Sequence, residues 1–350
     1  MTDPASPLAG RTVISVDAMG GDSGPAAVVA GLARAAKKDA DLRFLVFGDE
    51  ATLAPLVSKR LAGRAELRGT EGVVSMDDKP SQVMRRGKGT SMWEAIDAVR
   101  TGEAQIAVSC GNTGALMAVS MLLLRKLGGV DRPAIACLWP SRAPSGFNVM
   151  LDVGADIRAD ASSLTQYAIM GASYARNGLG IANPRVGLLN VGSEEHKGSA
   201  DLKEAAERIA AEEDRAGLRY VGFVEGSDIP SDRVDVIVTD GFTGNVALKT
   251  GEGTAKLVGE LLAEAFKYTP LSRLAALLAL TSLRRLQKRI DPRRVNGGVF
   301  LGLGGPVVKS HGAADATGIE AAVALAARLA RSGFQDRLRE RLANLPGRAA

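Results

Sequence analysis

The chain has 350 residues, of which 46% are hydrophobic and 24% are charged, and 44 basic against 39 acidic residues give a formal net charge of +5. This composition is that of an ordinary soluble globular protein and excludes a disordered or fibrous chain. Aromatic residues make up only 4% and the basic excess is thinly spread, so a nucleic-acid partner is not expected. The excess indicates either a solvated surface with a slight basic bias or an anionic partner, namely phosphate, an acidic protein or an anionic membrane surface.

The predicted elements alternate between short β-rich runs and longer helical patterns. Strand, loop and helix are expected in turn over 13–36, 42–61, 105–117, 186–210 and 234–249, with further helices over 82–101 and 161–176 and buried strands over 134–140, 147–155 and 220–226. Strands that are almost wholly apolar are typical of a parallel sheet covered by helices on both faces. We therefore predict a doubly wound, mostly parallel α/β fold in a single domain over residues 1–350.

Three glycine-rich loops follow predicted strands, and exposed backbone N–H groups at the helix starts beyond them suit an anion. We expect these loops to converge at one rim of the sheet and to bind phosphate or substrate there. None matches the GxGxxG dinucleotide fingerprint, and tight turns or simple helix caps are the alternative interpretation. The candidate residues are Asp17, Gly20, Gly21 and Asp22 in the first loop, Asn112, Thr113 and Gly114 in the second, and Asp240, Thr243, Gly244, Asn245 and Lys249 in the third.

Charged loops supply further candidates. His196 and Lys197 follow the strand predicted at 186–191, where Lys197 would neutralise a phosphate or a developing oxyanion. Lys88 lies in a basic, glycine-containing loop, and His311 precedes the C-terminal helix, so both are candidate anion ligands. Solvated loop charges and a structural histidine are the alternatives. Cys110 as a thiol nucleophile is a weaker hypothesis, because no histidine is near it in the sequence.

The cysteines and the hydropathy pattern bear on location. Cys110 and Cys137 are not in a CxxC pair, so neither a disulfide framework nor a metal site is expected. This use of cysteine predicts a location in the reducing cytoplasm. No apolar run reaches the ~18 residues that a spanning helix needs, and the N-terminus has no pattern of a secretion signal.

The segment 270–294 differs from the rest of the chain because it combines leucines with seven basic residues and one acidic residue. Such a helix or helical hairpin is suited to an anionic membrane interface. We predict a protruding helical tip that contacts the membrane peripherally, and the alternative is a helix packed on the core or on a dimer partner. The leucines expected to contact the membrane are Leu271, Leu274 and Leu278.

Several motifs together resemble those of the bacterial phosphate acyltransferase family of phospholipid synthesis. They are VDAMGGD at 16–22, MRRGKGTSM at 84–92, SCGNTGALM at 109–117, LDVGA at 151–155, GLLNVGSEEHKG at 187–198, VTDGFTGNVALK at 238–249 and GGVFLGLGGPVVKSHGAAD at 297–315. The resemblance runs in order from about residue 13 to about residue 330, and the motifs are specific as a set.

The resemblance implies that the protein transfers a long-chain acyl group from acyl-carrier protein to inorganic phosphate, giving acyl phosphate for phosphatidic acid synthesis without a cofactor. It implies Lys197 and Asn245 as the catalytic centre, a fold similar to isopropylmalate dehydrogenase and phosphotransacetylase, and a homodimer. It also implies a location at the inner face of the cell membrane, where the product passes to a membrane-bound glycerol-3-phosphate acyltransferase.

Two other functions fit the residues less well. A decarboxylating dehydrogenase that uses a nicotinamide cofactor would need a nucleotide loop and a carboxylate trio, and neither pattern is found in the sequence. A non-catalytic scaffold for carrier protein or lipid would bind these partners without releasing thiol on addition of phosphate.

Overall fold

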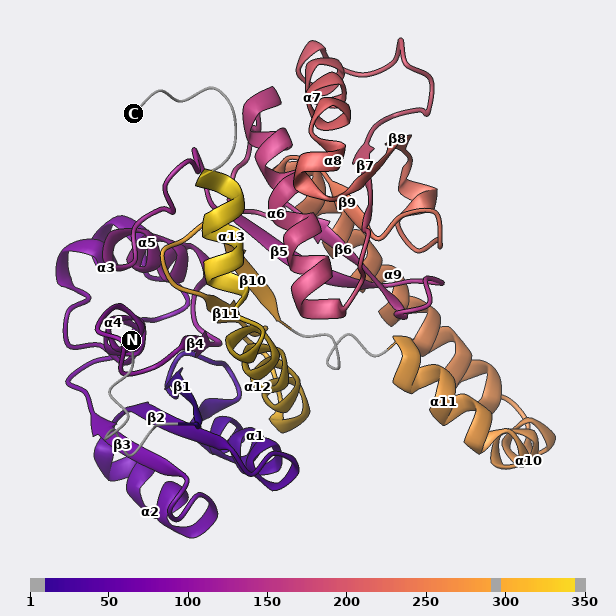
Figure 1. Cartoon of the computed structure of the whole chain (residues 1–350). Coiled ribbons are helices and arrows are strands. Elements are labelled where there is room, and N and C mark those ends of the chain that lie inside the picture. Colours follow the sequence, from indigo (N-terminus) through magenta and orange to yellow (C-terminus); the bar gives the residue numbers. More distant parts are fainter. Residues whose placement is uncertain (1–9, 291–296, 344–350) are drawn as a thin grey trace.

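The computed structural model describes residues 10–290 and 297–343 and contains one mixed sheet of 11 strands, in the order β3-β2-β1-β4-β11-β10-β5-β6-β9-β7-β8 (Figure 1). In chain order the strands are β1 (Thr12–Asp17), β2 (Leu42–Gly48), β3 (Ala65–Gly69), β4 (Ile106–Ser109), β5 (Ala134–Pro140), β6 (Phe147–Leu151), β7 (Arg185–Leu189), β8 (Arg219–Val224), β9 (Val236–Val238), β10 (Gly298–Leu301) and β11 (Val307–Lys309).

Helices cover both faces of this sheet, as the buried apolar strands require. They are α1 (Gly24–Lys38), α2 (Glu50–Arg60), α3 (Pro80–Arg86), α4 (Ser91–Arg100), α5 (Thr113–Leu123), α6 (Ala161–Leu179), α7 (Ala200–Ala211), α8 (Glu213–Ala216), α9 (Gly241–Lys267), α10 (Pro270–Leu278), α11 (Leu280–Ile290), α12 (Ala316–Arg331) and α13 (Phe334–Ala343). One core cluster packs α1, α6 and α12 against the sheet, and a second packs α4, α5 and α9 against the opposite face. The predicted α/β fold is therefore confirmed.

The sheet consists of two halves that run in opposite directions. Strands β1 to β4 are parallel to one another and to β11, whereas β10 is antiparallel to both β11 and β5. Strand β6 is in turn antiparallel to β5, and β9, β7 and β8 follow the direction of β6. The carboxyl ends of β1 and β4 thus open at one edge of the sheet and that of β9 at the other, so the expected common edge is not found. The loops after β4 and β9 nevertheless both contribute residues to one cavity, which is described below.

The element boundaries differ from the predicted ones mainly where polar side chains turn the chain. The strand expected over 147–155 ends at Leu151, because the carboxylate of Asp152 accepts hydrogen bonds from the backbone N–H groups of Ala155 (2.9 Å) and Asp156 (2.6 Å) and folds the chain into a loop. Strand β3 was not predicted, since its sequence AELRG is polar and largely half-buried, as is usual at a sheet edge.

The predicted tip is a helical hairpin that projects from the body of the molecule beyond the end of α9 (Figure 1). Leu271 is 76% exposed, Leu274 54% and Leu278 81%, so these leucines are not core residues of the chain. Residues 291–294 of the expected segment lie outside the described residues. In the part of the chain that the structure describes, no helix has both the length and the hydropathy to cross a bilayer.

Candidate active site

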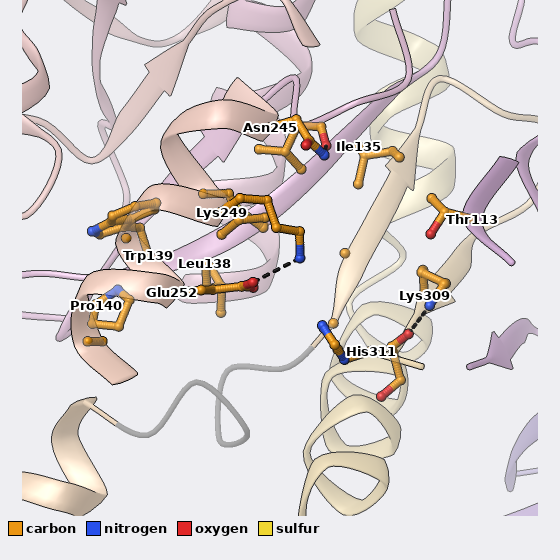
Figure 2. Close-up of a pocket in the computed structure, with 18 residues that line it drawn as sticks. Thr113, Ile135, Leu138, Trp139, Pro140, Asn245, Lys249, Glu252, Lys309 and His311 are labelled. Carbon is orange, nitrogen blue, oxygen red and sulfur yellow. Dashed lines mark hydrogen bonds and ion pairs between the residues drawn. The ribbon is translucent and has the colours of Figure 1, made fainter. Parts of the chain in front are cut away.

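A cavity of about 360 Å³ lies on the sheet face covered by α5 and α9 (Figure 2). Its volume is within the range of small-molecule sites, which is roughly 300–1,000 Å³. The lining comes from the start of α5, from β5, from the loop after β6, from α9 and from the adjoining ends of β10 and β11: Thr113, Ile135, Cys137, Leu138, Trp139, Pro140, Val153, Asn245, Leu248, Lys249, Gly251, Glu252, Ala255, Gly297, Gly298, Lys309, Ser310 and His311.

The floor of the cavity is set by strand register. Gly298 pairs with Lys309 on one side, and because Val299 pairs with Ala136, Gly298 lies opposite Cys137 on the other. Side chains in one row across a sheet point to the same face, so Lys309 and Cys137 both face the cavity. Gly298 contributes no side chain to this row, and Ile135 packs into the space beside it, since a Cβ on Gly298 would lie 2.9 Å from the Cγ2 of Ile135.

Lys309 is the principal site residue that the sequence analysis did not select. Its side chain is only 9% exposed, and its Nζ donates hydrogen bonds to the backbone carbonyls of Cys110, at 3.3 Å, and Ser310. Burial lowers the pKa of Lys309, and no carboxylate among the described residues lies within ion-pair distance of it. A buried ammonium held only by neutral carbonyls favours an anionic ligand. The signal in the sequence that could have pointed to Lys309 is its position after two valines, at the end of a strand.

A second lysine lies between the two ends of the cavity. Lys249 forms an ion pair with Glu252 at 2.8 Å, and its charge acts on Lys309, where it lowers the pKa further. Thr113 and His311 line the cavity as well, and the Nδ1 of His311 accepts a hydrogen bond from the backbone N–H of Ala313 at 3.2 Å. Figure 2 shows Lys249 and His311 between the Lys309 end and the opposite end, where Trp139 and Pro140 lie.

Asn245 is fixed on the first turn of α9. Asp240 caps this helix by accepting hydrogen bonds from the backbone N–H and the hydroxyl of Thr243, both at 2.8 Å. Gly244 allows the helix to approach the loop after β6, since a Cβ there would overlap the carbonyl oxygen of Asp152. Asn245 then donates to the carbonyl of Val153 at 3.2 Å and retains a second amide N–H for a ligand.

The first predicted loop lies beside the cavity rather than in its lining. The carboxylate of Asp17 is buried and accepts hydrogen bonds from the hydroxyls of Ser91 and Ser109, both at 2.7 Å. A Cβ on Gly20 would lie 2.8 Å from the Cα of Gly111, so the loops after β1 and β4 are in close contact. Asp17 thus orders the loops in the structure, and a direct contact of it with phosphate stays a prediction.

The same loop also packs against the loop after β11. The backbone N–H of Asp22 donates to the carbonyl of Gly312 at 2.8 Å, and a Cβ on Gly21 would lie 3.0 Å from the Cβ of Cys110. The loop that carries Gly20, Gly21 and Asp22 therefore supports the segment that presents His311 to the cavity. Burial raises the pKa of the Cys110 thiol to about 11, which argues against Cys110 as a thiolate nucleophile at neutral pH.

The second predicted loop divides between structural and cavity-lining residues. Asn112 caps α5 by accepting a hydrogen bond from the N–H of Ala115 at 3.0 Å, and its amide donates to the carbonyl of Met76 at 2.6 Å. A Cβ on Gly114 would lie 3.0 Å from Pro80, so this glycine allows close packing with α3. Of the three candidates in this loop, Thr113 alone lines the cavity.

Lys197 and His196 lie outside the cavity lining. The ammonium of Lys197 forms an ion pair with Glu194 at 2.8 Å and its side chain is 39% exposed, while His196 is exposed. Their loop follows β7, which is parallel to its neighbour β9, so this loop and the start of α9 open at the same edge of the sheet. Lys88 lies apart from all of these and lines a separate polar cavity with Arg68, Glu71 and Glu94.

Comparisons with known proteins agree with this architecture. A family model described as "Fatty acid synthesis protein" matches residues 12–337. Relatives named phosphate acyltransferase include one from Jannaschia sp., 69% identical over 343 residues that cover 97% of this chain and 94% of the relative, and one from Paracoccus denitrificans, 71% identical over 333 residues that cover 95% and 90%.

Solved structures share the fold at low sequence identity. A phosphotransacetylase from Streptococcus pyogenes has a TM-score of 0.60 at 16% identity and covers 92% of this chain and 94% of its own. EutD phosphotransacetylase from Staphylococcus aureus has a TM-score of 0.58 at 16% identity, over 91% and 94%. These matches confirm the predicted fold type. The chain belongs to the fatty acid synthesis protein family, together with the enzymes named phosphate acyltransferase.

Proposed function

We propose that this enzyme transfers a long-chain acyl group from acyl-carrier protein to inorganic phosphate, giving acyl phosphate and free carrier protein. The observation that carries the proposal is the division of the cavity, which has Lys309 at one end, Lys249 with its partner Glu252 in the middle, and Trp139 and Pro140 at the other end. An acyl phosphate has the same division between an anion and a hydrocarbon chain. The basic balance of the chain, +5, also suits an acidic carrier protein.

The chemistry requires no nucleophilic side chain. A phosphate oxygen attacks the thioester carbonyl, a C–O bond forms, and the tetrahedral oxyanion collapses with cleavage of the C–S bond; the departing sulfur takes up a proton. We assign Lys309 and Lys249 to phosphate binding, with Thr113 and His311 beside them. Asn245 would donate its free amide N–H to the oxyanion, and Lys197 would neutralise the oxyanion or the phosphate after exchanging Glu194 for substrate.

The test is a transfer assay with palmitoyl-acyl-carrier protein and phosphate. Free thiol and acyl phosphate, the latter trapped by hydroxylamine as a hydroxamate, should appear in equal amounts and only when phosphate is present. Binding of carrier protein without thiol release would favour the scaffold hypothesis, and reduction of a nicotinamide cofactor would favour the dehydrogenase. Either result would overturn the proposal.

We also propose that the protein is a homodimer in which α9 contacts its counterpart. Leu257, Val258 and Leu261 on this helix are each more than half exposed, at 54%, 54% and 55%, and a second copy would cover them. Light scattering should give about twice the 36.4 kDa mass of the chain. A single-chain mass at micromolar concentration would contradict the dimer.

The tip formed by α10 and α11 is proposed to dock on the inner face of the cell membrane, where acyl phosphate passes to a membrane-bound glycerol-3-phosphate acyltransferase. The exposed leucines would bury apolar area and the exposed Arg284 and Arg285 would face anionic headgroups.

The double variant Leu274→Glu, Leu278→Glu should therefore no longer float with anionic vesicles, while its transfer activity in solution stays close to that of the unaltered protein. Leu122→Glu, on α5 and away from both the tip and α9, is the matched control for vesicle binding, because Leu122 is 48% exposed. Unchanged flotation of the double variant would show that the leucines do not contact lipid.

A further inference from the structure

The loop after β6 holds the side chain of Asn245 in place. The carbonyl of Val153 accepts the hydrogen bond from the Asn245 amide at 3.2 Å. Gly154 lies against the same amide, since a Cβ on it would come within 3.1 Å of the Asn245 Nδ2, and its φ of +124° is one that other residues rarely adopt. The carbonyl of Asp156 accepts a hydrogen bond from the N–H of Gly241 at 2.7 Å, which joins the loop to the start of α9. The direction of the Asn245 amide therefore depends on the shape of this loop.

One buried carboxylate sets the shape of the loop. The Oδ2 of Asp152 accepts the hydrogen bonds from the backbone N–H groups of Ala155 and Asp156, and its Oδ1 accepts one from the N–H of Ile135 at 2.7 Å. Gly241 packs directly on this carboxylate, because a Cβ there would lie 2.5 Å from the Oδ2. Asp152 thus joins the loop both to β5, which lines the cavity, and to the first turn of α9.

We propose that Asp152 is a positioning residue, which aims the second amide N–H of Asn245 at the oxyanion by holding the loop after β6 in place. This proposal rests on the proposed acyl transfer. Turn formation alone does not account for the burial of Asp152, since Asp49 and Asp160 accept hydrogen bonds from cap N–H groups in exposed positions. A buried carboxylate is costly, and asparagine cannot replace it, because its NH2 group would face N–H groups that are donors as well.

The ionisation of Asp152 makes the position of the loop sensitive to pH. Burial raises the pKa of Asp152 to about 6. The titratable groups near it are Cys137 on β5 and Tyr167 on α6, whose pKa values burial also raises, and Asp156, which forms an ion pair with Arg132 at 3.2 Å; α9 presents glycines to it. A proton on Asp152 would set an O–H donor against backbone N–H donors, so the loop would have to shift.

The shift can be measured without turnover on the Asn245 amide itself. In isotope-labelled protein, the side-chain amide signal of Asn245, identified by its absence from Asn245→Ala, should move with a midpoint near pH 6. In Asp152→Asn the signal should lie elsewhere and should not move over this range. The melting temperature should not fall through the same range on account of Asp152, because a raised pKa means that the folded protein binds this proton more tightly than the unfolded chain does.

The matched control is Asp235→Asn. Asp235 is also a buried aspartate that accepts a backbone hydrogen bond, from the N–H of Arg185 at 2.9 Å, but it lies just before β9 and thus at the end of this strand away from α9. This variant should keep the Asn245 signal and its response to pH. The same displacement of the signal in Asp235→Asn and Asp152→Asn would overturn the proposal.

A double-mutant cycle tests the link to catalysis. Asp152→Asn should lower kcat by about 10-fold or more and change the KM for phosphate little, because a small misplacement of a group that acts in the transition state reduces the rate. In the Asn245→Ala background the same change should cost much less, since the amide that Asp152 positions is absent. Equal losses of kcat in both backgrounds would show that Asp152 acts only on the fold.

The outcomes keep the two proposals apart. If the unaltered enzyme transfers acyl groups to phosphate but Asp152→Asn changes neither kcat nor the Asn245 signal, the positioning role is wrong and acyl transfer stands. If the unaltered enzyme does not transfer acyl groups, the proposed function fails whatever the Asn245 signal shows. If Asp152→Asn does not fold, the unaltered protein decides the question, because an Asn245 signal that does not move through about pH 6 would overturn the proposal.

Discussion

Replacing Lys309 with methionine should lower kcat/KM for phosphate by about 100-fold or more, since loss of one partner of a buried charged contact usually costs about 2–5 kcal/mol. The methionine side chain keeps most of the volume but removes the only buried ammonium that faces the Thr113 and His311 end of the cavity within the described residues. The loss should appear mainly as a higher KM for phosphate. The measurement is steady-state kinetics over a range of phosphate concentrations.

The control for this variant is Lys256→Met on α9, where the lysine side chain is 78% exposed and lies outside the cavity lining. The melting temperature of Lys309→Met should not fall, because removal of a buried charge in favour of an apolar group of similar volume is often neutral or stabilising. A phosphate KM equal to that of the Lys256→Met control would show that Lys309 has only a structural role.

The same residue makes a prediction about pH. Burial lowers the pKa of Lys309, so the folded protein loses this proton at a lower pH than an exposed lysine does. The cation is present below that pKa and absent above it, so the affinity for phosphate should decline as the pH rises through it. Lys309→Met should lack this alkaline decline. An identical pH profile of phosphate KM in both proteins would contradict the assignment.

Lys197→Ala should also lower kcat by about 100-fold or more, and Asn245→Ala should do the same, if these residues stabilise the oxyanion. Neither change should lower the melting temperature much. Lys197 has a single ion pair, with Glu194, in an exposed loop, and Asn245 donates one hydrogen bond to a backbone carbonyl in the described structure. Single-turnover measurement of thiol release separates this chemical step from binding.

Lys203→Ala is the matched control for Lys197, because Lys203 is exposed on α7, a few residues beyond the same loop. We expect it to retain full activity. Near-normal thiol release by a folded Lys197→Ala variant would remove Lys197 from the catalytic centre and leave Asn245, Lys249 and Lys309 as the groups around the reacting atoms.

The sequence was sufficient to predict the strand and helix pattern because the buried strands are nearly all apolar and the loops between them contain glycines and helix-capping residues. The predicted mostly parallel sheet is confirmed, but the reversal of strand direction around β10, β5 and β6 was not predicted. The short connection between β5 and β6, residues 141–146, indicates an antiparallel pair, since a parallel pair needs a crossover of about a dozen residues or more. Applying that rule would have placed the end of β9 at the opposite sheet edge from the ends of β1 and β4, although Thr113 and Asn245 still line one cavity.

Only some of the site residues could be predicted, because the sequence does not show which polar residues the fold buries beside the cavity. Asn245, Thr113, Lys249 and His311 line the cavity as polar residues near strand or helix ends often do. Lys309 was missed because its importance comes from burial between β4 and β10, and the sequence VVK carries no sign of that environment. Asp17, Asn112 and Asp240 have hydrogen-bonding roles within loops and caps that a sequence pattern does not distinguish from ligand binding.

The place of β10 and β11 in the sheet has a consequence for how the protein is made. Among the residues that the structure describes, these strands are the last, yet they lie in the middle of the sheet between β4 and β5. Until residues 298–309 leave the ribosome, β4 and β5 both present unpaired edges, which are sites of aggregation. The contacts that close the sheet span long sequence separations, so this insertion should be a slow, late step of folding. A nascent chain that stops before residue 298 therefore lacks both Lys309 and the floor of the cavity. It also exposes the unpaired edges of β4 and β5, which a chaperone would have to shield from aggregation.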